Sequence, residues 1–443
     1  MKNARETIVD LLTTIEKEET YMQLLLKKEL DNIKKEDRGF ITEVVYGTVK
    51  HQLKLDYFIN HVSKTPVKKM KPFIKHLMRM SAYQLIFLDK IPASATINEA
   101  VKLVKKRKMH NLSGFVNGVL RNLERQKDEI SLPDVNTHKI EHFSIKYSMP
   151  SWLIEMWLEM YGTEEMEKIC TAFNERAEVC IRINKNQISK NELILELQNE
   201  GIECSDGIIF PEDNLYLKKT YNIGNLNSFL EGKWTPQDES ASLVSHLLNP
   251  QKGDKILDMC AAPGGKSTHI AELSNDECEI ISADLYPHKT ELIQKNADRL
   301  NLKSIKIIVN NGINFNKSWE DSFERILLDV PCSGLGVIKR KPDMRYHKTP
   351  EDILAISEVQ KQLVNNAVRY LKAGGTLLYS TCTLSKIENE DMVKYILNLG
   401  LKLDPITDDV PDLVKPYIKE ENHIQILPYI AKTDGFFIAR FKK

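Results

Sequence analysis

Residues 255–268, KILDMCAAPGGKST, decide the fold of the second half of this 443-residue chain. The segment starts as an apolar run of strand length, passes through a loop with a glycine pair and continues into residues that can open a helix. From Gly253 onward, strand-like and helix-like segments alternate to the end of the chain. This alternation predicts an α/β, Rossmann-like, doubly wound sheet, because each parallel strand needs a crossover helix.

The strands expected in this sheet are short apolar runs bounded by turns. They cover 255–259, 279–285, 305–309, 325–329 and 376–380, and a helix with one apolar stripe is expected over 353–371. Two later strands, 424–428 and 435–441, are close enough in sequence to form an antiparallel pair at the sheet edge. Ligands of doubly wound sheets bind at the carboxyl ends of the strands, where the glycine loop lies.

Three kinds of ligand compete for the glycine loop. Its tail, GKS, matches a P-loop, but the glycine that a P-loop needs five residues before Gly265 is Cys260. The nicotinamide-binding pattern G-x-G-x-x-G is absent. S-adenosylmethionine needs a tight backbone turn and an acid at the end of the next strand for its ribose hydroxyls. Asp284 stands 20 residues beyond Gly264, at that strand end, so the sequence favours S-adenosylmethionine.

Two cysteines follow neighbouring strands of the expected sheet. Cys332 lies in DVPCSG (329–334), after one central strand, and Cys382 lies in STCT (380–383), after the next. A lone free cysteine is usually a small buried hydrophobic residue. Two cysteines at the ligand-binding edge of adjacent strands indicate thiol chemistry beside the glycine loop.

A cysteine thiolate would activate cytosine for methylation. The C5 atom of the aromatic ring is a poor nucleophile, but a thiolate that adds at C6 makes C5 enamine-like, so that it can attack a sulfonium methyl. The site must favour the thiolate, which is the reactive form. Asp329 suits an acid facing N3, because a carboxyl in a closed pocket can keep its proton. Spacing leaves open which cysteine attacks.

The first half of the chain has helical periodicity instead. Over residues 4–127, apolar residues recur at helical spacing, with breaks expected at Gly39, at 65–66, at 91–92 and near Gly114. A helix after Pro150, a strand over 179–183, an amphipathic helix and the apolar run 207–210 predict a small α/β unit. The expected organisation is multidomain: an all-α domain at 1–128, a linker at 129–149, the small unit at 150–233 and the Rossmann-like domain at 234–443.

Composition excludes several classes of protein. No apolar run approaches the ~20 residues needed to span a bilayer, and the first residues lack the apolar core of a secretory signal. The seven cysteines include no C-x-x-C pair, which argues against a disulfide framework or a zinc ribbon. We therefore expect a cytoplasmic protein with reduced thiols and no bound metal.

A net charge of zero hides an asymmetry along the chain. Residues 1–127 contain 25 Lys and Arg against 14 Asp and Glu, a net charge of +11, so the remainder carries −11. A basic domain favours a polyanion as its partner, although a solvated basic face gives the same composition. The candidates for phosphate contacts are Lys105, Lys106, Arg107, Lys108, Arg340 and Lys341.

Taken together, the sequence blocks of the second half resemble the Fmu/Sun family of RNA cytosine-5 methyltransferases. The blocks are QDESAS (237–242), 258–266, Asp284, DVPCS (329–333), STC (380–382) and DGFF (434–437). The resemblance implies that Cys382 attacks the base and that Cys332 assists product release. It also implies S-adenosylmethionine as the cofactor, held by Cys260, Ala261, Ala262, Pro263, Gly264, Gly265, Lys266, Asp284, Asn311 and Asp329.

Residues 1–127 resemble a NusB-like, antitermination-factor-type RNA-binding domain. The matching stretches are RGF (38–40), VYGT (45–48), YQL (83–85), NEAV (98–101) and FVNGVLR (115–121). This pairing of domains belongs to the branch that methylates 16S ribosomal RNA, so the resemblance implies that RNA, free or in an assembling subunit, as the partner of a monomeric enzyme. A transfer RNA substrate and a non-catalytic RNA adaptor are the alternatives. The intact residues Asp329, Cys332 and Cys382 speak against the adaptor.

One position departs from the family's pattern. The family often has Gly-Asp-Gly after the third strand, with the Asp on the adenine amino group, and this chain has NNG at 310–312. Asn311 can still accept a hydrogen bond through its amide oxygen, but less strongly than a carboxylate. We expect Asn311→Asp to bind S-adenosylmethionine more tightly, by up to about tenfold, in equilibrium binding measurements. An affinity no tighter than that of the wild type would contradict this.

Overall fold

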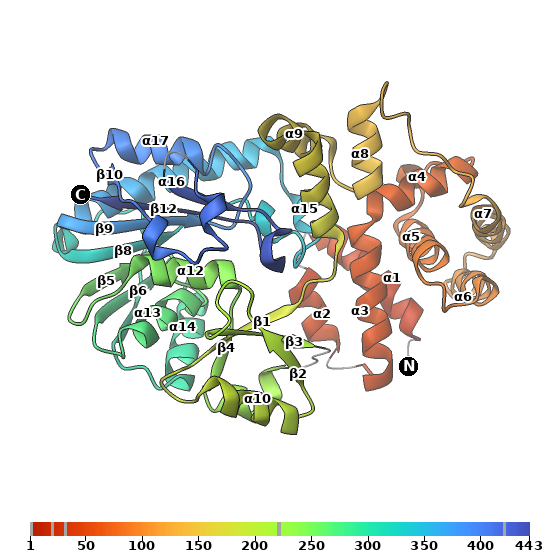
Figure 1. The fold of residues 1–443 in the computed structure, drawn as a ribbon. Coiled ribbons are helices and arrows are strands. Elements are labelled where there is room, and N and C mark those ends of the chain that lie inside the picture. Colours follow the sequence, from red (N-terminus) through yellow and green to blue (C-terminus); the bar gives the residue numbers. More distant parts are fainter. Residues whose placement is uncertain (1–2, 19–21, 31–32, 219–222, 420–421) are drawn as a thin grey trace. The chain divides into compact units, whose positions relative to one another are not determined.

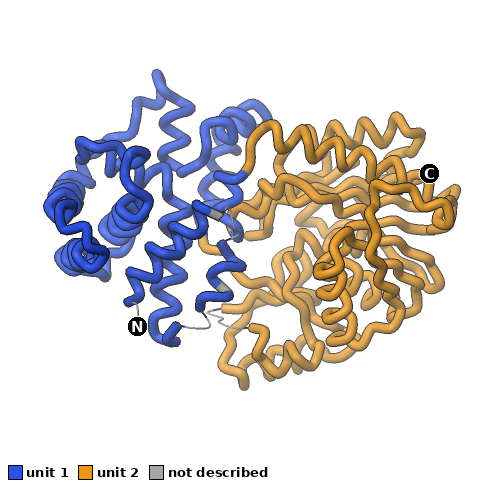
Figure 2. Tube along the Cα trace, turned by 180° about the vertical axis from the view of Figure 1, so that it is seen from behind, with its two compact units in different colours: residues 1–175, 340–347 blue, residues 176–339, 348–443 orange. Residues whose placement is uncertain are grey.

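The computed structural model describes residues 3–18, 22–30, 33–218, 223–419 and 422–443. Its chain divides into two compact units (Figure 2). The first comprises Met1–Glu175 and Arg340–His347, and the second comprises Arg176–Lys339 and Lys348–Lys443. No described helix is long and apolar enough to cross a membrane.

The first unit is all-helical in its described residues, as the apolar periodicity predicts. One buried core of aliphatic and aromatic side chains runs from Ile8 to Ile130. Its α-helices are α1 (Ala4–Glu18), α2 (Met22–Leu30), α3 (Lys35–Lys50), α4 (Gln52–Val62), α5 (Pro72–Phe87), α6 (Ala93–Lys106), α7 (Ser113–Gln126), α8 (Lys139–Tyr147), α9 (Ser151–Asn174) and α15 (Met344–His347).

Two features of this unit differ from the sequence-based expectations. Gly39 lies inside α3 and does not break it, because the buried residues Ile41, Val44 and Val45 keep the helical stripe going. Part of the expected linker is the helix α8, whose Phe143 contributes to its buried face. Helix α8 packs on α9, and both helices group with the first compact unit.

Residues 340–347 join the first unit although they stand between two segments of the second. The side chain of Arg345 is fully buried. Its Nη1 donates to the carbonyl oxygens of Lys50 and Ser148 and to Oδ1 of Asn174, each at 3.1 Å. A guanidinium that satisfies several buried acceptors fixes this short segment among α3, α8 and α9.

The second unit contains a small antiparallel sheet of order β2-β3-β1-β4. The apolar run 207–210 is a turn between β2 and β3, and the buried carboxylate of Glu239 accepts backbone N–H bonds from residues 208, 209 and 210. The elements are β1 (Val179–Ile183), α10 (Lys190–Asn199), β2 (Glu203–Asp206), β3 (Asn214–Lys218), α11 (Asn227–Leu230) and β4 (Trp234–Pro236).

The large sheet has the order β10-β12-β9-β8-β5-β6-β7, with β11 paired to β12. Strands β5 to β9 are parallel, and β12 runs antiparallel to β9. The predicted Rossmann-like class is confirmed, and so is the antiparallel pair at the end of the chain. The strands are β5 (Lys255–Asp258), β6 (Glu279–Asp284), β7 (Ile305–Val309), β8 (Phe323–Asp329), β9 (Leu371–Thr381), β10 (Lys402–Leu403), β11 (His423–Ile426) and β12 (Phe436–Lys442).

Helices cover both faces of the large sheet. Figure 1 shows α16 and α17 on one face and α12, α13 and α14 on the other. This layering buries the sheet on both sides, which explains why its strands read as nearly continuous apolar runs. The helices are α12 (Glu239–Leu248), α13 (Gly265–Leu273), α14 (Pro287–Arg299), α16 (Pro350–Tyr370) and α17 (Glu390–Asn398).

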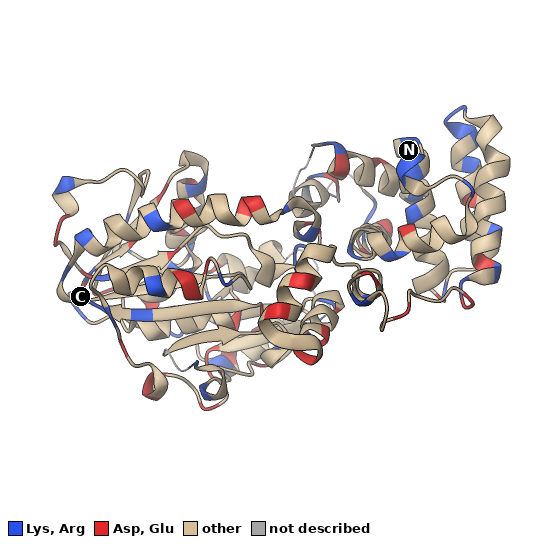
Figure 3. Ribbon diagram, turned by 90° about the horizontal axis from the view of Figure 1, so that it is seen from above, with Lys and Arg blue, Asp and Glu red and all other residues tan. Residues whose placement is uncertain are grey.

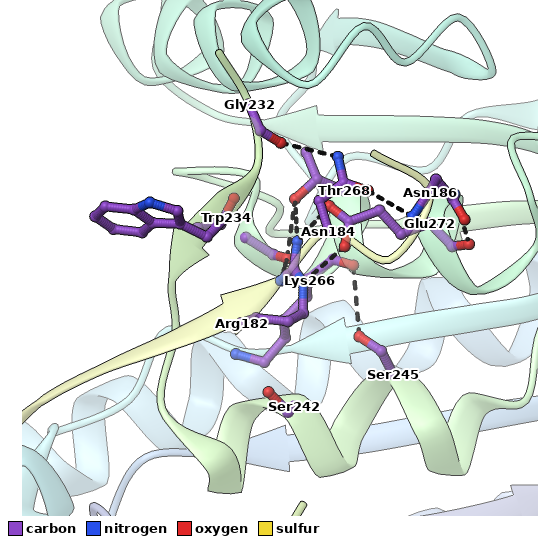
Figure 4. Close-up of polar contacts among 12 residues, drawn as sticks. Arg182, Asn184, Asn186, Gly232, Trp234, Ser242, Ser245, Lys266, Thr268 and Glu272 are labelled. Carbon is purple, nitrogen blue, oxygen red and sulfur yellow. Dashed lines mark hydrogen bonds and ion pairs between the residues drawn. The ribbon is translucent and has the colours of Figure 1, made fainter. Parts of the chain in front are cut away.

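A buried ion pair ties the small sheet to helix α13 (Figure 4). Arg182 of β1 is 1% exposed, and its Nε and Nη2 donate to the two carboxylate oxygens of Glu272 at 2.9 and 2.8 Å. Its Nη1 also donates to the carbonyl oxygen of Gly265 at 3.1 Å. Gly265 is the first residue of α13, so this arginine holds the end of the glycine loop through a backbone carbonyl.

Removing one partner of this pair should destabilise the protein. Arg182→Met leaves the Glu272 carboxylate buried and unpaired, and we expect the free energy of unfolding to fall by about 3–5 kcal/mol. Urea unfolding of the full chain measures this. The double variant Arg182→Met/Glu272→Met removes both charges and should regain most of the loss. An unchanged midpoint for the single variant would contradict the structural role of the pair.

Candidate active site

The glycine loop joins β5 to α13 through a left-handed turn. Gly264 has φ +99°, and its N–H donates to the carbonyl oxygen of Ala261 at 2.6 Å. A Cβ atom at Gly264 would lie 3.1 Å from the backbone of Ile293 in α14. The backbone conformation and the close approach of α14 therefore both favour glycine at this position.

Two acidic residues flank this loop. Asp258, at the end of β5, is 1% exposed and accepts a 2.6 Å bond from the Ser267 hydroxyl, and burial raises its pKa to about 7. Asp284, at the end of β6, accepts only long bonds of 3.3 Å from the backbone N–H groups of Ala262 and Tyr286. The Asp284 carboxylate thus retains acceptor capacity for hydroxyl groups at the strand ends.

The residues around the loop fit S-adenosylmethionine. The turn at Gly264 places a residue without a side chain at the start of α13. Asp284, at the end of β6, is held next to the loop by the bond from the Ala262 N–H. Asn311 follows β7. Its Oδ1 accepts a hydrogen bond from the Ile313 N–H at 3.3 Å, and its amide NH2 group takes no part in that bond. Burial raises the pKa of the Cys260 thiol well above its usual value, so this cysteine is a thiol within the loop.

The structure brings the two predicted cysteines together. Asp329 of β8 pairs in register with Ser380 of β9, so the loops that follow both strands start side by side. The Sγ atoms of Cys332 and Cys382 lie 3.4 Å apart, within hydrogen-bond distance for two thiols. Both side chains are partly exposed.

Lys266 and Asp329 connect the glycine loop to the cysteines. The Lys266 ammonium donates to Oδ2 of Asp329 at 2.7 Å, and the Ser380 hydroxyl donates to Oδ1 at 2.8 Å. Burial lowers the pKa of Lys266, but the charge and hydrogen bond of Asp329 outweigh it, and the net shift is upward.

Phe436 and Gly435 lie beside these groups. The Lys266 Nζ stands 5.1 Å from the centre of the Phe436 ring, in cation–π geometry. The Gly435 N–H donates to the carbonyl oxygen of Gly336, and the Gly336 N–H donates to that of Cys382, both at 2.9 Å. A Cβ at Gly336 would lie 2.0 Å from the Gly435 oxygen, so these three loops pack backbone to backbone.

Several residues that support the site were missed from the sequence. They are Arg182 below the glycine loop, and Gln360, Glu388 and Asn389 below the cysteines. Each stands far along the chain from at least one of its partners, so no local spacing points to the contact. The only signal in the sequence for these residues was a polar residue type at a position with apolar neighbours.

The basic residues proposed for phosphate contacts are exposed or half-buried. Some of them form ion pairs with acidic side chains. Lys106 donates to Glu6 at 2.5 Å and Arg107 to Asp10 at 2.6 Å, whereas Lys105 and Lys108 are simply exposed. Arg340 is half-buried and Lys341 exposed, both in the segment that joins the first unit. Figure 3 shows basic and acidic positions interspersed along both units.

Three family descriptions match successive parts of the chain. "16S rRNA methyltransferase RsmB/F" matches residues 245–442, the NusB family matches residues 2–125, and a ferredoxin-like domain of RsmF/B-like methyltransferases matches residues 149–224. The NusB-like, small α/β and methyltransferase folds expected from the sequence are thereby confirmed.

Relatives align with this chain over nearly their whole length. A probable ribosomal RNA small subunit methyltransferase B of Bacillus subtilis is 36% identical, covering 100% of this chain and 99% of the relative. The Escherichia coli O1:K1 protein named ribosomal RNA small subunit methyltransferase B is 30% identical, with coverage of 100% and 99%.

Two solved structures are similar to this one. The structure of PH0851 has a TM-score of 0.82 and 27% identity, covering 100% of this chain and 99% of that one. NSun6 from Pyrococcus horikoshii, determined with SFG, has a TM-score of 0.59 and 26% identity, covering 66% of this chain and 98% of that one. The chain belongs to the RsmB/F family of 16S rRNA methyltransferases, which are S-adenosylmethionine-dependent enzymes.

Proposed function

We propose that this enzyme transfers a methyl group to C5 of a cytosine in 16S ribosomal RNA through a covalent bond between Cys382 and C6. The observation that carries this proposal is the pair of thiols 3.4 Å apart at the ends of adjacent parallel strands, beside the Lys266–Asp329 ion pair. One thiol is needed to add to the ring and a second group to help it leave.

Cys382 is the nucleophile in this proposal. The Lys266 ammonium lies close enough for its charge to interact with that of a Cys382 thiolate, and the thiolate is the form that attacks. The Cys382 Sγ adds to C6, and the electron pair of the C5=C6 bond shifts away from C6 onto C5 and the remaining ring atoms. C5 then carries the electron density that forms the new bond to the methyl carbon.

Asp329 and Lys266 act on the opposite edge of the ring. As the thiolate adds, negative charge develops at N3 and O2 of the cytosine. The Lys266–Asp329 pair offers a charged hydrogen-bond donor and an acceptor at one place, so it can stabilise that charge and pass a proton to N3. Ser380, which donates to the other oxygen of Asp329, holds the carboxylate in one orientation.

Cys332 assists release of the product. The hydrogen bond to Cys382 and burial raise the pKa of Cys332, so its sulfur carries a proton near neutral pH. In the release step the C5 proton passes to water, the C5–H electron pair forms C5=C6, and the C6–S bond breaks with its pair going to Cys382. The proton that N3 took up during attack returns to the Lys266–Asp329 pair. The Cys332 S–H then stabilises the departing thiolate by donating a hydrogen bond to it.

The loop residues 260–266, Asp284 and Asn311 would hold S-adenosylmethionine. When bound, this cofactor supplies an electrophilic methyl group on a sulfonium. The chain contributes the turn at Gly264 for the methionine end, the Asp284 carboxylate for the ribose hydroxyls and Asn311 for the adenine. Buried Asp258 steadies this arrangement through the hydroxyl of Ser267.

We assign RNA binding to the basic helical unit and the small α/β unit. Structured RNA is held mainly through phosphates and shape, and an unpaired or flipped base enters the reaction site. The exposed Lys105 and Lys108, together with Lys106, Arg107, Arg340 and Lys341, are the proposed phosphate contacts. Binding through them will weaken as salt concentration rises.

Loss of the nucleophile should abolish the reaction. Cys382→Ala is expected to reduce methyl transfer by about a thousandfold or more, because this mechanism assigns the bond to C6 to Cys382 alone. The measurement uses radiolabelled S-adenosylmethionine with deproteinised 16S RNA, 23S RNA and bulk transfer RNA. Label as 5-methylcytosine in 16S RNA that persists in the variant would refute the role of Cys382. Label in transfer RNA alone would refute the ribosomal substrate.

Loss of the second cysteine should stop the reaction after methyl transfer. Cys332→Ala keeps Cys382 but removes the group that assists its departure, so a covalent protein–RNA adduct should accumulate. Denaturing gel electrophoresis of the variant with labelled RNA detects it as a slower band. The double variant Cys332→Ala/Cys382→Ala is the control, since it cannot form the bond. A Cys332→Ala enzyme that turns over without adduct would contradict this division of roles.

A further inference from the structure

A buried carboxylate lies between the two cysteine loops. Glu388 is fully buried and has no part in the chemistry described above. Its Oε1 accepts the Ser333 N–H at 2.8 Å, and its Oε2 accepts the Ser333 hydroxyl at 2.5 Å. Ser333 directly follows Cys332, so this carboxylate holds one side of the Cys332 loop through two bonds.

The other side of the Cys332 loop is tied to the same carboxylate. The amide nitrogen of Gln360 donates to the Pro331 carbonyl oxygen at 3.0 Å and to Glu388 Oε1 at 3.2 Å. The Tyr379 hydroxyl donates to the Glu388 carbonyl oxygen at 2.7 Å. Both neighbours of Cys332 are therefore bonded, directly or through Gln360, to Glu388.

The next residue along the chain holds the Cys382 loop in the same way. Asn389 is also fully buried. Its Oδ1 accepts the Thr381 hydroxyl at 2.6 Å, and its Nδ2 donates to the Thr383 carbonyl oxygen at 3.1 Å. Thr381 and Thr383 flank Cys382. A single dipeptide thus binds the neighbours of both cysteines.

The two halves of this support differ in what they bind. Glu388 makes two short bonds to Ser333 but reaches Thr383 only at 3.5 Å, whereas the recorded side-chain bonds of Asn389 to the cysteine loops go to the Cys382 side. The Ser333 and Thr383 hydroxyls, 2.6 Å apart, connect them. A change at Glu388 should loosen Cys332 first, and a change at Asn389 should loosen Cys382 first.

Burying a carboxylate is costly, which argues that it has a purpose beyond packing. Burial raises the pKa of Glu388, and the bonds from Ser333 and Gln360 oppose the shift. Apolar residues of similar volume often stabilise a core as well as a buried charged group does. The charge of Glu388 also adds to the forces that raise the pKa of Cys332, which keeps that sulfur protonated.

We propose that Glu388 and Asn389 are positioning residues that divide the reaction between them, Glu388 serving release through Cys332 and Asn389 serving attack through Cys382. This inference rests on the proposed covalent mechanism. Of the two cysteines, attack requires only Cys382 at the right place, whereas release requires the Cys332 sulfur within reach of the Cys382 sulfur. Each step therefore depends on a different half of the support.

The test compares Glu388→Gln with Asn389→Asp in the full chain. Glu388→Gln keeps the side chain's shape but replaces one acceptor oxygen with an NH2 group facing Ser333. Asn389→Asp removes the donor to Thr383 and keeps the acceptor for Thr381. Glu390→Gln is the matched control, because it makes the same change at the adjacent, half-buried carboxyl, which has no recorded bond to either cysteine loop among the described residues.

Three quantities are measured with labelled S-adenosylmethionine and 16S RNA: methyl transfer in a single turnover, steady-state turnover and the fraction of enzyme in covalent adduct. Glu388→Gln should slow steady-state turnover at least about tenfold and accumulate adduct, with a much smaller loss in the first turnover. Asn389→Asp should slow the first turnover at least about tenfold without adduct. Glu390→Gln should behave as the wild type.

Cys332→Ala distinguishes failure of this inference from failure of the proposed function. If Cys332→Ala accumulates adduct but Glu388→Gln, folded as judged by its thermal midpoint, does not, the role of Glu388 is refuted and the mechanism stands. If Cys332→Ala itself forms no adduct, the covalent mechanism fails. Should Glu388→Gln not fold, Ser333→Ala removes the hydroxyl bonds to Oε2 and to Thr383 but keeps the backbone bond to Oε1, and normal turnover without adduct in that variant refutes the inference.

Discussion

The parallel pairing of β8 with β9 is the constraint on which the rest of the site depends. With Asp329 opposite Ser380, the two loops that carry the cysteines leave the sheet at the same height and in the same direction. The pairing of β5 with β8 then sets the glycine loop on the other side of Asp329. One sheet edge therefore brings a methyl-donor loop and two thiols together without any long-range loop having to close over them.

Lys266 turns this arrangement of strands into one electrostatic unit. Its backbone belongs to the glycine loop, and its ammonium binds the carboxylate at the end of β8. The Lys266 ammonium lies near Asp329, the Cys382 sulfur and the Phe436 ring, so one positive charge acts on all three groups. Under the proposed mechanism, this one side chain would couple cofactor binding to activation of the base.

The sequence was most informative where a short apolar run is followed by a glycine, an aspartate or a cysteine. Strand positions, the glycine turn, Asp284 and the adjacency of Cys332 and Cys382 could all be predicted, because each depends on a local pattern and on the known edge of a parallel sheet. Arg182 with Glu272, and Glu388 with Ser333, could not, because their partners stand 90 and 55 residues apart and nothing local marks them. Helix α8 was missed because turn residues on either side hid its short apolar face.

Residues 340–347 give the helical unit an unusual dependence. They lie between the Pro-Cys loop and α16, yet their Arg345 fills a buried polar pocket made by Lys50, Ser148 and Asn174. The first unit therefore does not consist of one continuous segment that ends at residue 175. A chain cut there would leave those carbonyl oxygens and the Asn174 amide without their guanidinium, so the first unit can complete its own interior only after the ribosome has translated about half of the catalytic domain.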